Sequence, residues 1–214
     1  METYPAVQPR PFELSGGHPA LDFVNSLDNR FAKDGPVELL RDYDDLLRFA
    51  EQSQLLDARG ARLLARSVTP AAAARALRAA RELREAIGAV LYRRLDGGVP
   101  AAADIRILER RIQEADRHRE LHWEAPAARF PGQATLQWQW GRSAMAADFP
   151  VWLVAHAASQ LLLSDAMEQV RACGAETCRW LFLDTSKNHT RRWCNMKVCG
   201  NRAKAHRFQQ RHAK

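Results

Sequence analysis

The stretch CGAETCRWLFLDTSKNHTRRWCNMKVCGNR, residues 173–202, contains all four cysteines of this 214-residue chain. They stand in two pairs with the spacing C-x4-C-x15-C-x4-C. A tetrahedral zinc ion needs four ligands, and two short cysteine loops that are brought together can supply them. The spacing therefore predicts one zinc ion bound by Cys173, Cys178, Cys194 and Cys199.

Three alternatives compete with zinc: disulfide bonds, an iron–sulfur cluster and free thiols. The opening METYPAVQPRPFELSGG contains two acidic residues and no apolar segment typical of a secretion signal, so we expect a cytoplasmic protein. A reducing cytoplasm disfavours disulfides. Four thiolates close the coordination shell of zinc and leave no place for an activated water molecule. We therefore expect a structural ion and a protein that is not an enzyme.

The residues around the cysteines predict a treble-clef-like finger. Between the two pairs, Trp180–Leu183 is rich in β-formers, DTSKN favours a turn, and Arg191–Trp193 can return as a second strand. After Cys199 the run GNRAKAHRFQQRHAK contains strong helix formers. A segment of about 40 residues buries little apolar surface, so metal ligation is expected to supply most of its folding free energy.

Positive charge is concentrated in the same segment. Residues 171–214 contain eleven Lys and Arg but two acidic residues, a net charge of +9, whereas the other 170 residues carry −2. This asymmetry indicates a polyanionic partner. We expect seven basic side chains to contact nucleic acid: Lys187, Arg191, Arg192, Arg202, Lys204, Arg207 and Arg211.

Two motifs carry a resemblance to a known family. The tetrapeptide CGNR at 199–202, preceded by CGAETCRWLFLDTS, resembles the CGNR zinc finger. The stretch GHPALDFVNSLDNR, residues 17–30, is similar to the opening of the ABATE domain, which precedes the finger in that family. The resemblance implies a bacterial, stress-induced transcription regulator in which the four cysteines bind metal.

The first 165 residues predict a helical domain with one β-hairpin. Residues 69–98 begin with Thr69 as an N-cap followed by proline, and they end at two glycines. Helical periodicity recurs at 37–56, at 101–118 and from Phe149. Residues 121–140 alternate Leu and Trp with polar residues around a Pro-Gly break. We expect an α+β chain, with a mainly α-helical domain (1–165) that has a small hairpin, followed by the four-cysteine zinc finger (166–214).

Polar side chains in the N-terminal motif raise a second expectation. A small-ligand pocket would use Asp22, Asn25, Arg30 and Trp138, whereas a simpler interpretation has Asp22 and Asn25 bonding to buried backbone. The tryptophans of the predicted hairpin can stack on a planar ligand, although such residues usually pack in cores. The longest apolar run, Phe149–Leu163, is too short for a membrane span, so no membrane partner is expected.

These patterns together predict a zinc-dependent, nucleic-acid-binding regulator, with DNA favoured over RNA and a small-molecule effector as a further partner. One alternative is an RNA-binding finger in which Trp180 and Trp193 stack on unpaired bases. Another is a zinc-stabilised protein-interaction module whose basic helix docks on an acidic partner. A chain with one finger gains specificity by dimerising, so a homodimer is also expected.

Overall fold

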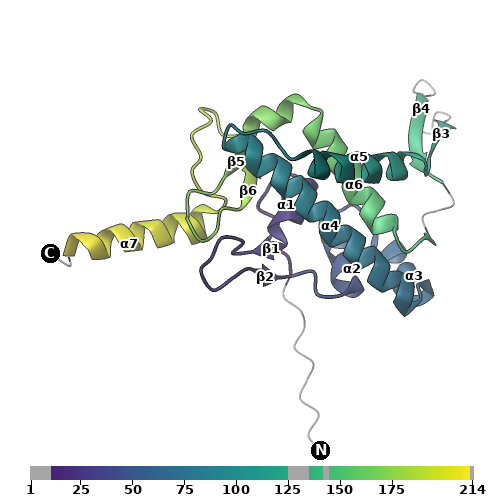
Figure 1. The fold of residues 1–214 in the computed structure, drawn as a ribbon, viewed down its shortest axis with the longest axis horizontal. Coiled ribbons are helices and arrows are strands. Elements are labelled where there is room, and N and C mark those ends of the chain that lie inside the picture. Colours follow the sequence, from purple (N-terminus) through teal and green to yellow (C-terminus); the bar gives the residue numbers. More distant parts are fainter. Residues whose placement is uncertain (1–10, 125–134, 142–144, 213–214) are drawn as a thin grey trace, which may run out of the picture.

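The computed structural model describes residues 11–124, 135–141 and 145–212. Within these residues six α-helices pack side by side in the N-terminal part, and a seventh projects from the end of the molecule opposite the β3–β4 hairpin (Figure 1). The helices are α1 (Pro19–Asn25), α2 (Tyr43–Gln52), α3 (Ala58–Ser67), α4 (Pro70–Leu95), α5 (Ala102–Asp116), α6 (Phe149–Leu162) and α7 (Asn201–His212). The fold is therefore mainly helical, as predicted.

The strands form three antiparallel pairs within the described residues. These are β1 (Leu27–Asp28) with β2 (Val37–Glu38), β3 (Arg119–Glu124) with β4 (Thr135–Trp140), and β5 (Val170–Ala172) with β6 (Leu181–Leu183). None of the helices in the described part of the chain is long and apolar enough to cross a membrane.

The helix α4 forms where its sequence signals place it. The Thr69 hydroxyl accepts a hydrogen bond from the Ala72 amide, Pro70 occupies the first turn, and Gly97 adopts a left-handed conformation beyond the end. Its buried face, which includes Leu83, Ile87 and Leu91, contributes to the main hydrophobic core together with α1 and α6.

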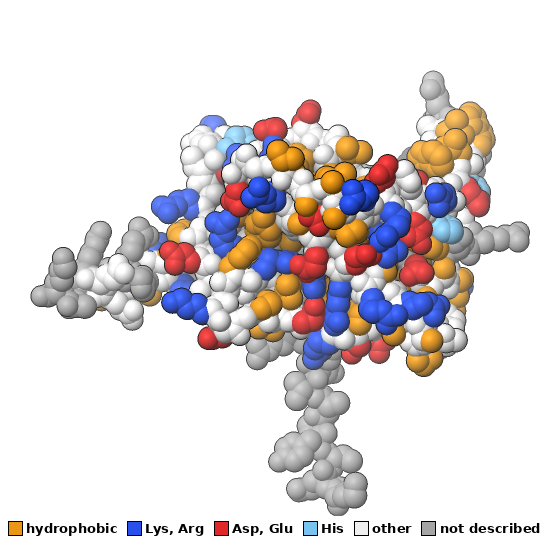
Figure 2. Space-filling model, viewed as in Figure 1, with side chains coloured by type: hydrophobic (Ala, Val, Ile, Leu, Met, Phe, Trp, Pro, Cys, Tyr) orange, Lys and Arg blue, Asp and Glu red, His pale blue; other side chains and the backbone are white. Residues whose placement is uncertain are grey.

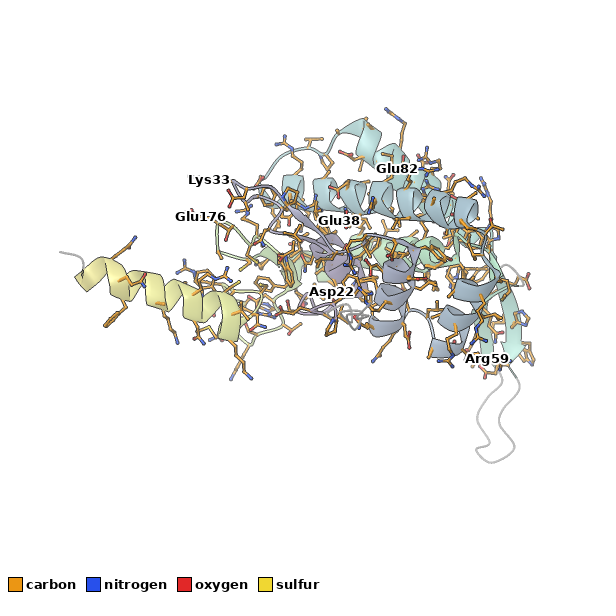
Figure 3. The ribbon with its side chains drawn as sticks, turned by 90° about the horizontal axis from the view of Figure 1, so that it is seen from below. Asp22, Lys33, Glu38, Arg59, Glu82 and Glu176 are labelled. Carbon is orange, nitrogen blue, oxygen red and sulfur yellow. The ribbon has the colours of Figure 1, made fainter. Side chains whose placement is uncertain are left out.

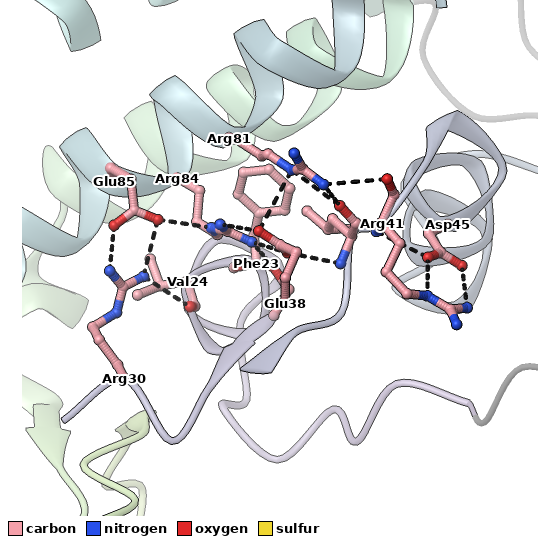
Figure 4. Close-up of polar contacts among 11 residues, drawn as sticks. Phe23, Val24, Arg30, Glu38, Arg41, Asp45, Arg81, Arg84 and Glu85 are labelled. Carbon is pink, nitrogen blue, oxygen red and sulfur yellow. Dashed lines mark hydrogen bonds and ion pairs between the residues drawn. The ribbon is translucent and has the colours of Figure 1, made fainter. Parts of the chain in front are cut away.

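The predicted helix over 37–56 begins later, at Tyr43. Val37 and Glu38 instead pair with β1, and the Glu38 carboxylate accepts hydrogen bonds of 2.6 and 2.7 Å from the buried Arg84 guanidinium (Figure 4). Asp42 then caps α2 by accepting a 2.8 Å bond from the Asp45 amide. A long-range ion pair and a capping side chain thus override the apparent helical periodicity.

The predicted hairpin of residues 121–140 is present as β3 and β4, with its Pro-Gly break outside the described residues, but its tryptophans are not all in the core. Trp140, at its base, packs edge-to-face on Phe149 with ring centroids 5.4 Å apart. Trp123 and Trp138 are 66% and 55% exposed. The expectation of a packed core is therefore wrong for these two side chains, because β3 and β4 extend beyond the helices (Figure 1).

The hairpin predicted inside the finger is also different. β6 pairs with β5, which precedes the first cysteine, and not with residues 191–193. The segment 185–191, which follows β6, folds around the buried Asp184 carboxylate. This carboxylate accepts hydrogen bonds from Ser186 and from the Arg191 amide. These side-chain contacts replace a strand ladder at Arg191.

Candidate metal centre and its surroundings

The four cysteines converge on one buried point. Their sulfur atoms all lie within 4.8 Å of one another, and none forms a disulfide. The Cys178 and Cys194 sulfurs are 3.6 Å apart, and those of Cys194 and Cys199 are 3.8 Å apart. Zinc–sulfur bonds of about 2.3 Å in a tetrahedron place the sulfurs roughly 3.8 Å apart. The residues therefore fit a single structural zinc ion.

The first cysteine pair is held by the β5–β6 hairpin. The Cys173 amide donates to the Trp180 carbonyl at 2.8 Å, which continues the strand pairing up to the metal ligand. The Cys178 amide donates to the Ala175 carbonyl at 3.0 Å, so the four intervening residues form a tight turn. The hairpin thus brings both sulfurs to the same side.

The second pair is held at the entrance to α7. Asn195 accepts a 2.9 Å bond from the Lys197 amide through its side chain, and its carbonyl accepts a 2.9 Å bond from the Cys199 amide. A single π-helical turn, Met196–Gly200, follows and leads directly into α7. The last ligand and the basic helix therefore share one rigid turn.

The thiols do not all ionise readily without a metal. Hydrogen bonds from Cys178 and Cys194 lower the pKa of Cys173. Hydrogen bonding to Cys173 in turn raises the pKa of Cys178 and Cys194, and burial raises the pKa of Cys199. Four adjacent thiolates need a cation between them, and Zn²⁺ supplies that charge.

Arg191, one of the seven basic residues predicted to contact nucleic acid, is engaged within the finger. Its guanidinium donates to the backbone carbonyls of Trp193 and Cys194 and lies 4.4 Å from the centre of the Phe182 ring. These contacts fix the chain beside Cys194, so Arg191 supports the metal site. Arg191 is nevertheless exposed, and its contact with nucleic acid stays a prediction.

The other predicted basic residues differ in how far they are defined. Lys187, Arg192, Arg202 and Lys204 are exposed, and Arg192 lies 5.4 Å from the centre of the Trp193 ring. The side chains of Arg207 and Arg211 lie outside the described residues. α7, which carries four of the seven predicted residues, projects from the body in both views (Figures 1 and 3).

A hollow separates the base of α7 from the N-terminal domain. It has a volume of about 160 Å³ and is lined by Glu13, Asp28 and Asn29 on one side and by Asn195 and Arg202 on the other. Cys178, Cys194 and Cys199 also line it, so it adjoins the metal site. Arg202 therefore stands at the junction between the cluster, the helix and the N-terminal motif.

The finger is joined to the N-terminal domain by Asn25, which bonds to buried backbone as the simpler interpretation of the sequence had it. The Asn25 amide group donates to the Leu181 carbonyl and accepts from the Leu181 amide, both at 2.9 Å. The Leu183 amide donates to the Gly16 carbonyl at 2.8 Å. α1 and the loop before it thus occupy the free edge of β6. The asparagine within an apolar helix indicated a bond to buried backbone, but it did not identify Leu181 as the partner.

The predicted ligand pocket is not assembled. Asp22 and Asn25 are buried in α1, where Asp22 accepts a 2.7 Å bond from the Gly16 amide (Figure 3 places Asp22 within the body). Arg30 pairs with Glu85 of α4 (Figure 4), and Trp138 lies on the projecting hairpin. These four side chains do not gather, because the polar groups of α1 are used on the protein's own backbone.

Comparison with known families matches both parts of the chain. Residues 17–165 match the ABATE family, described as "Putative stress-induced transcription regulator", and residues 169–212 match the CGNR zinc finger. A search of curated proteins found no match. The chain therefore belongs to the ABATE family and carries a C-terminal CGNR zinc finger, as the resemblance implied.

Proposed function

We propose that this ABATE–CGNR protein is a nucleic-acid-binding transcription regulator whose α7 contacts phosphates, with DNA as the favoured target. Zinc would act structurally, and we propose no catalytic role. The family descriptions name a regulator and a zinc finger, which supports this class of function. In the reducing cytoplasm expected from the sequence, the cysteines would remain available to the metal.

The observation that carries the proposal is the combination of charge and placement in α7. The helix starts at Asn201, two residues after the last zinc ligand, projects from the body (Figure 3), and presents exposed Arg202 and Lys204 in its first turn. No acidic residue follows Asp184 in the sequence. A projecting cationic helix suits a groove lined by phosphates.

The surroundings of Trp180 and Arg202 bear on the two alternatives, an RNA-binding finger and a protein-interaction module. Trp180 is only 9% exposed and packs within the cysteine cluster, which leaves little of its ring for stacking on an RNA base. Arg202 lines the same hollow as Glu13 and Asp28, yet within the described residues it forms no ion pair with either and is exposed. We propose no small-molecule effector, because the residues expected to bind one lie apart.

Salt-dependent binding of the zinc-loaded protein to duplex DNA and to single-stranded RNA tests this proposal. The variant Arg202→Ala/Lys204→Ala/Arg207→Ala should bind DNA more weakly and should lower the slope of log K against log salt by about 2–3, since each lost phosphate contact removes nearly one unit.

A matched control removes the same number of charges at the other end of the molecule. The α3 residues Arg59, Arg62 and Arg66 are exposed, and Figure 3 shows Arg59 far from α7. Their triple alanine variant should keep the wild-type slope. Equal effects of the two variants would show that binding depends on overall charge and would refute a specific role for α7, whereas tighter binding to RNA would overturn the choice of DNA.

A further inference from the structure

The projecting hairpin exposes an apolar face that the proposed binding of DNA through α7 does not use. Leu121, Trp123, Leu136 and Trp138 are 56%, 66%, 61% and 55% exposed. Hydrophobic side chains gather on this hairpin in the space-filling view (Figure 2). Large apolar groups that cluster on a protruding element mark an interaction surface. The arrangement of its leucines and tryptophans indicates what kind of partner this face binds.

The strand register places these four side chains on one face. Leu121 lies opposite Trp138, and Trp123 lies opposite Leu136. The alternate positions, which include Glu120, His122 and Gln137, point to the other face because side chains alternate along a strand. One face of the hairpin is therefore apolar and the other polar.

The apolar face continues the protein core outwards. Trp140, at the base of β4, points to the same face as Trp138 because the two are two residues apart. It packs on Phe149 and His156 of α6. Arg119 is the one charged residue of β3 and β4 on this face, and its guanidinium lies 5.0 Å from the centre of the Trp138 ring. Beyond this base, the described residues of β3 and β4 on this face carry no charge, so neither a phosphate backbone nor a charged peptide complements them.

We infer that this apolar face binds the same face of a second copy of the chain. The two tryptophans occupy one diagonal of the four-residue patch and the two leucines occupy the other. When two such patches stack about a two-fold axis lying in the plane of the sheet, each tryptophan meets a leucine of the partner, whether the axis runs along or across the strands. Large side chains thus oppose smaller ones, which is the condition for close packing in an isologous interface.

The available area reaches the lower limit for a dimer and fits a weak or moderate one. The exposed parts of two tryptophans and two leucines amount to roughly 500 Å² per copy, so two copies would bury on the order of 1,000 Å² in total. A two-stranded hairpin is only marginally stable by itself, and packing against a second sheet would stabilise it. In Figure 1 the hairpin and α7 lie at opposite ends, so the dimer leaves both basic helices free.

The inference is tested by measuring the mass of the full-length, zinc-loaded protein by sedimentation between about 1 and 100 µM, a range that spans the affinities of weak to moderate complexes. The wild type should be dimeric at the upper end. Leu136→Glu should weaken dimerisation at least about 100-fold, because it buries one carboxylate from each copy in an apolar interface.

The matched control is Gln137→Glu, which adds the same charge to the adjacent residue on the opposite face and should leave the dimer intact. Trp138→Ser provides a second test without added charge and should weaken the dimer at least about tenfold. Near-ultraviolet circular dichroism checks that each variant keeps its tertiary structure.

A wild type that stays monomeric at the highest concentration overturns the inference, as does a dimer that survives both Leu136→Glu and Trp138→Ser. Dissociation by Gln137→Glu to the same extent also contradicts it. Because no nucleic acid enters the measurement, the outcome is independent of the proposed function.

Discussion

The helical domain and the finger reach a stable fold by different means. The main core consists of apolar side chains from six helices and extends to Val170 and Leu181 at the start of the finger. The second cluster contains the four cysteines, Trp180 and Phe182 as its buried members. The first can be stabilised by apolar burial, whereas the second contains too few apolar side chains and depends on its metal. The difference predicts separate responses to perturbation.

Removal of zinc should give the largest effect and should act on one cluster. Cys194→Ser, or chelation of the wild type, is expected to unfold the finger, with a loss on the order of 10 kcal/mol of ligation free energy. α1 to α6 should remain helical because their core consists of other residues. Circular dichroism at 222 nm and metal content measure the two effects. Loss of nearly all helical signal on chelation would contradict two separately stabilised clusters.

The reverse experiment targets the helical domain through Arg84. Its guanidinium is 3% exposed and bonds to Glu38, Glu85 and Ser26 (Figure 4). Arg84→Met leaves the Glu38 carboxylate without its main partner, so the free energy of unfolding should fall by about 3–5 kcal/mol.

Arg110→Met is the control for Arg84→Met, because Arg110 forms an ion pair with Glu82 on the surface and should cost less than about 1 kcal/mol. Denaturant titration of both variants measures the difference. Equal destabilisation would show that burial of the Arg84 ion pair does not matter.

Asn25 connects the two clusters, so its substitution should affect both. Asn25→Asp replaces the amide donor to the Leu181 carbonyl with an oxygen and should cost about 3 kcal/mol. Zinc affinity should fall as well, because β6 leads from Leu181 into the metal site. Asn188→Asp makes the same chemical change at an exposed position and should be nearly neutral. A competition titration with a zinc chelator, beside thermal unfolding, distinguishes a joint effect from a local one.

The buried carboxyl group of Asp22, in α1, predicts that the stability of the helical domain depends on pH. Burial raises the pKa of Asp22 to about 6, so in the folded state the carboxyl group keeps its proton where the unfolded chain releases it. Stability from this group is present below about pH 4 and is lost as pH rises to about 6. Asp22→Asn should therefore match the wild type at about pH 4 and exceed it at pH 7.5 by up to about 3 kcal/mol. Urea unfolding at both pH values measures the difference, and equal stabilities at pH 7.5 would refute the raised pKa.

Substitution of Arg191 should give the smallest effect, and it tests whether this arginine serves the structure of the finger or the binding of nucleic acid. Arg191→Lys keeps the charge but cannot reproduce the forked contacts with the Trp193 and Cys194 carbonyls. It should destabilise the finger by about 1 kcal/mol and leave the salt dependence of DNA binding unchanged. Arg191→Ala, which removes the charge, completes the test: a salt slope lowered by nearly one unit in this variant would instead place Arg191 at the phosphates.

Local patterns in the sequence were sufficient to predict several elements of the fold and the metal site. The caps of α4 and the alternation in β3 and β4 act between near neighbours, and the cysteine spacing is read within one segment of 27 residues. Each was found where the pattern placed it. The late start of α2 was missed because it depends on Glu38 meeting Arg84, a residue 46 positions away.

The sequence by itself determined the number and spacing of the zinc ligands, the mainly helical domain and the concentration of positive charge near its end. Only the tertiary structure decided how those parts are used. It placed Asn25 on Leu181, 156 residues later, engaged Arg191 within the finger, left α7 projecting and exposed Trp123 and Trp138. The physical reason is that composition and local periodicity specify which groups must be buried or paired, whereas their partners come from contacts that form only when distant segments pack together.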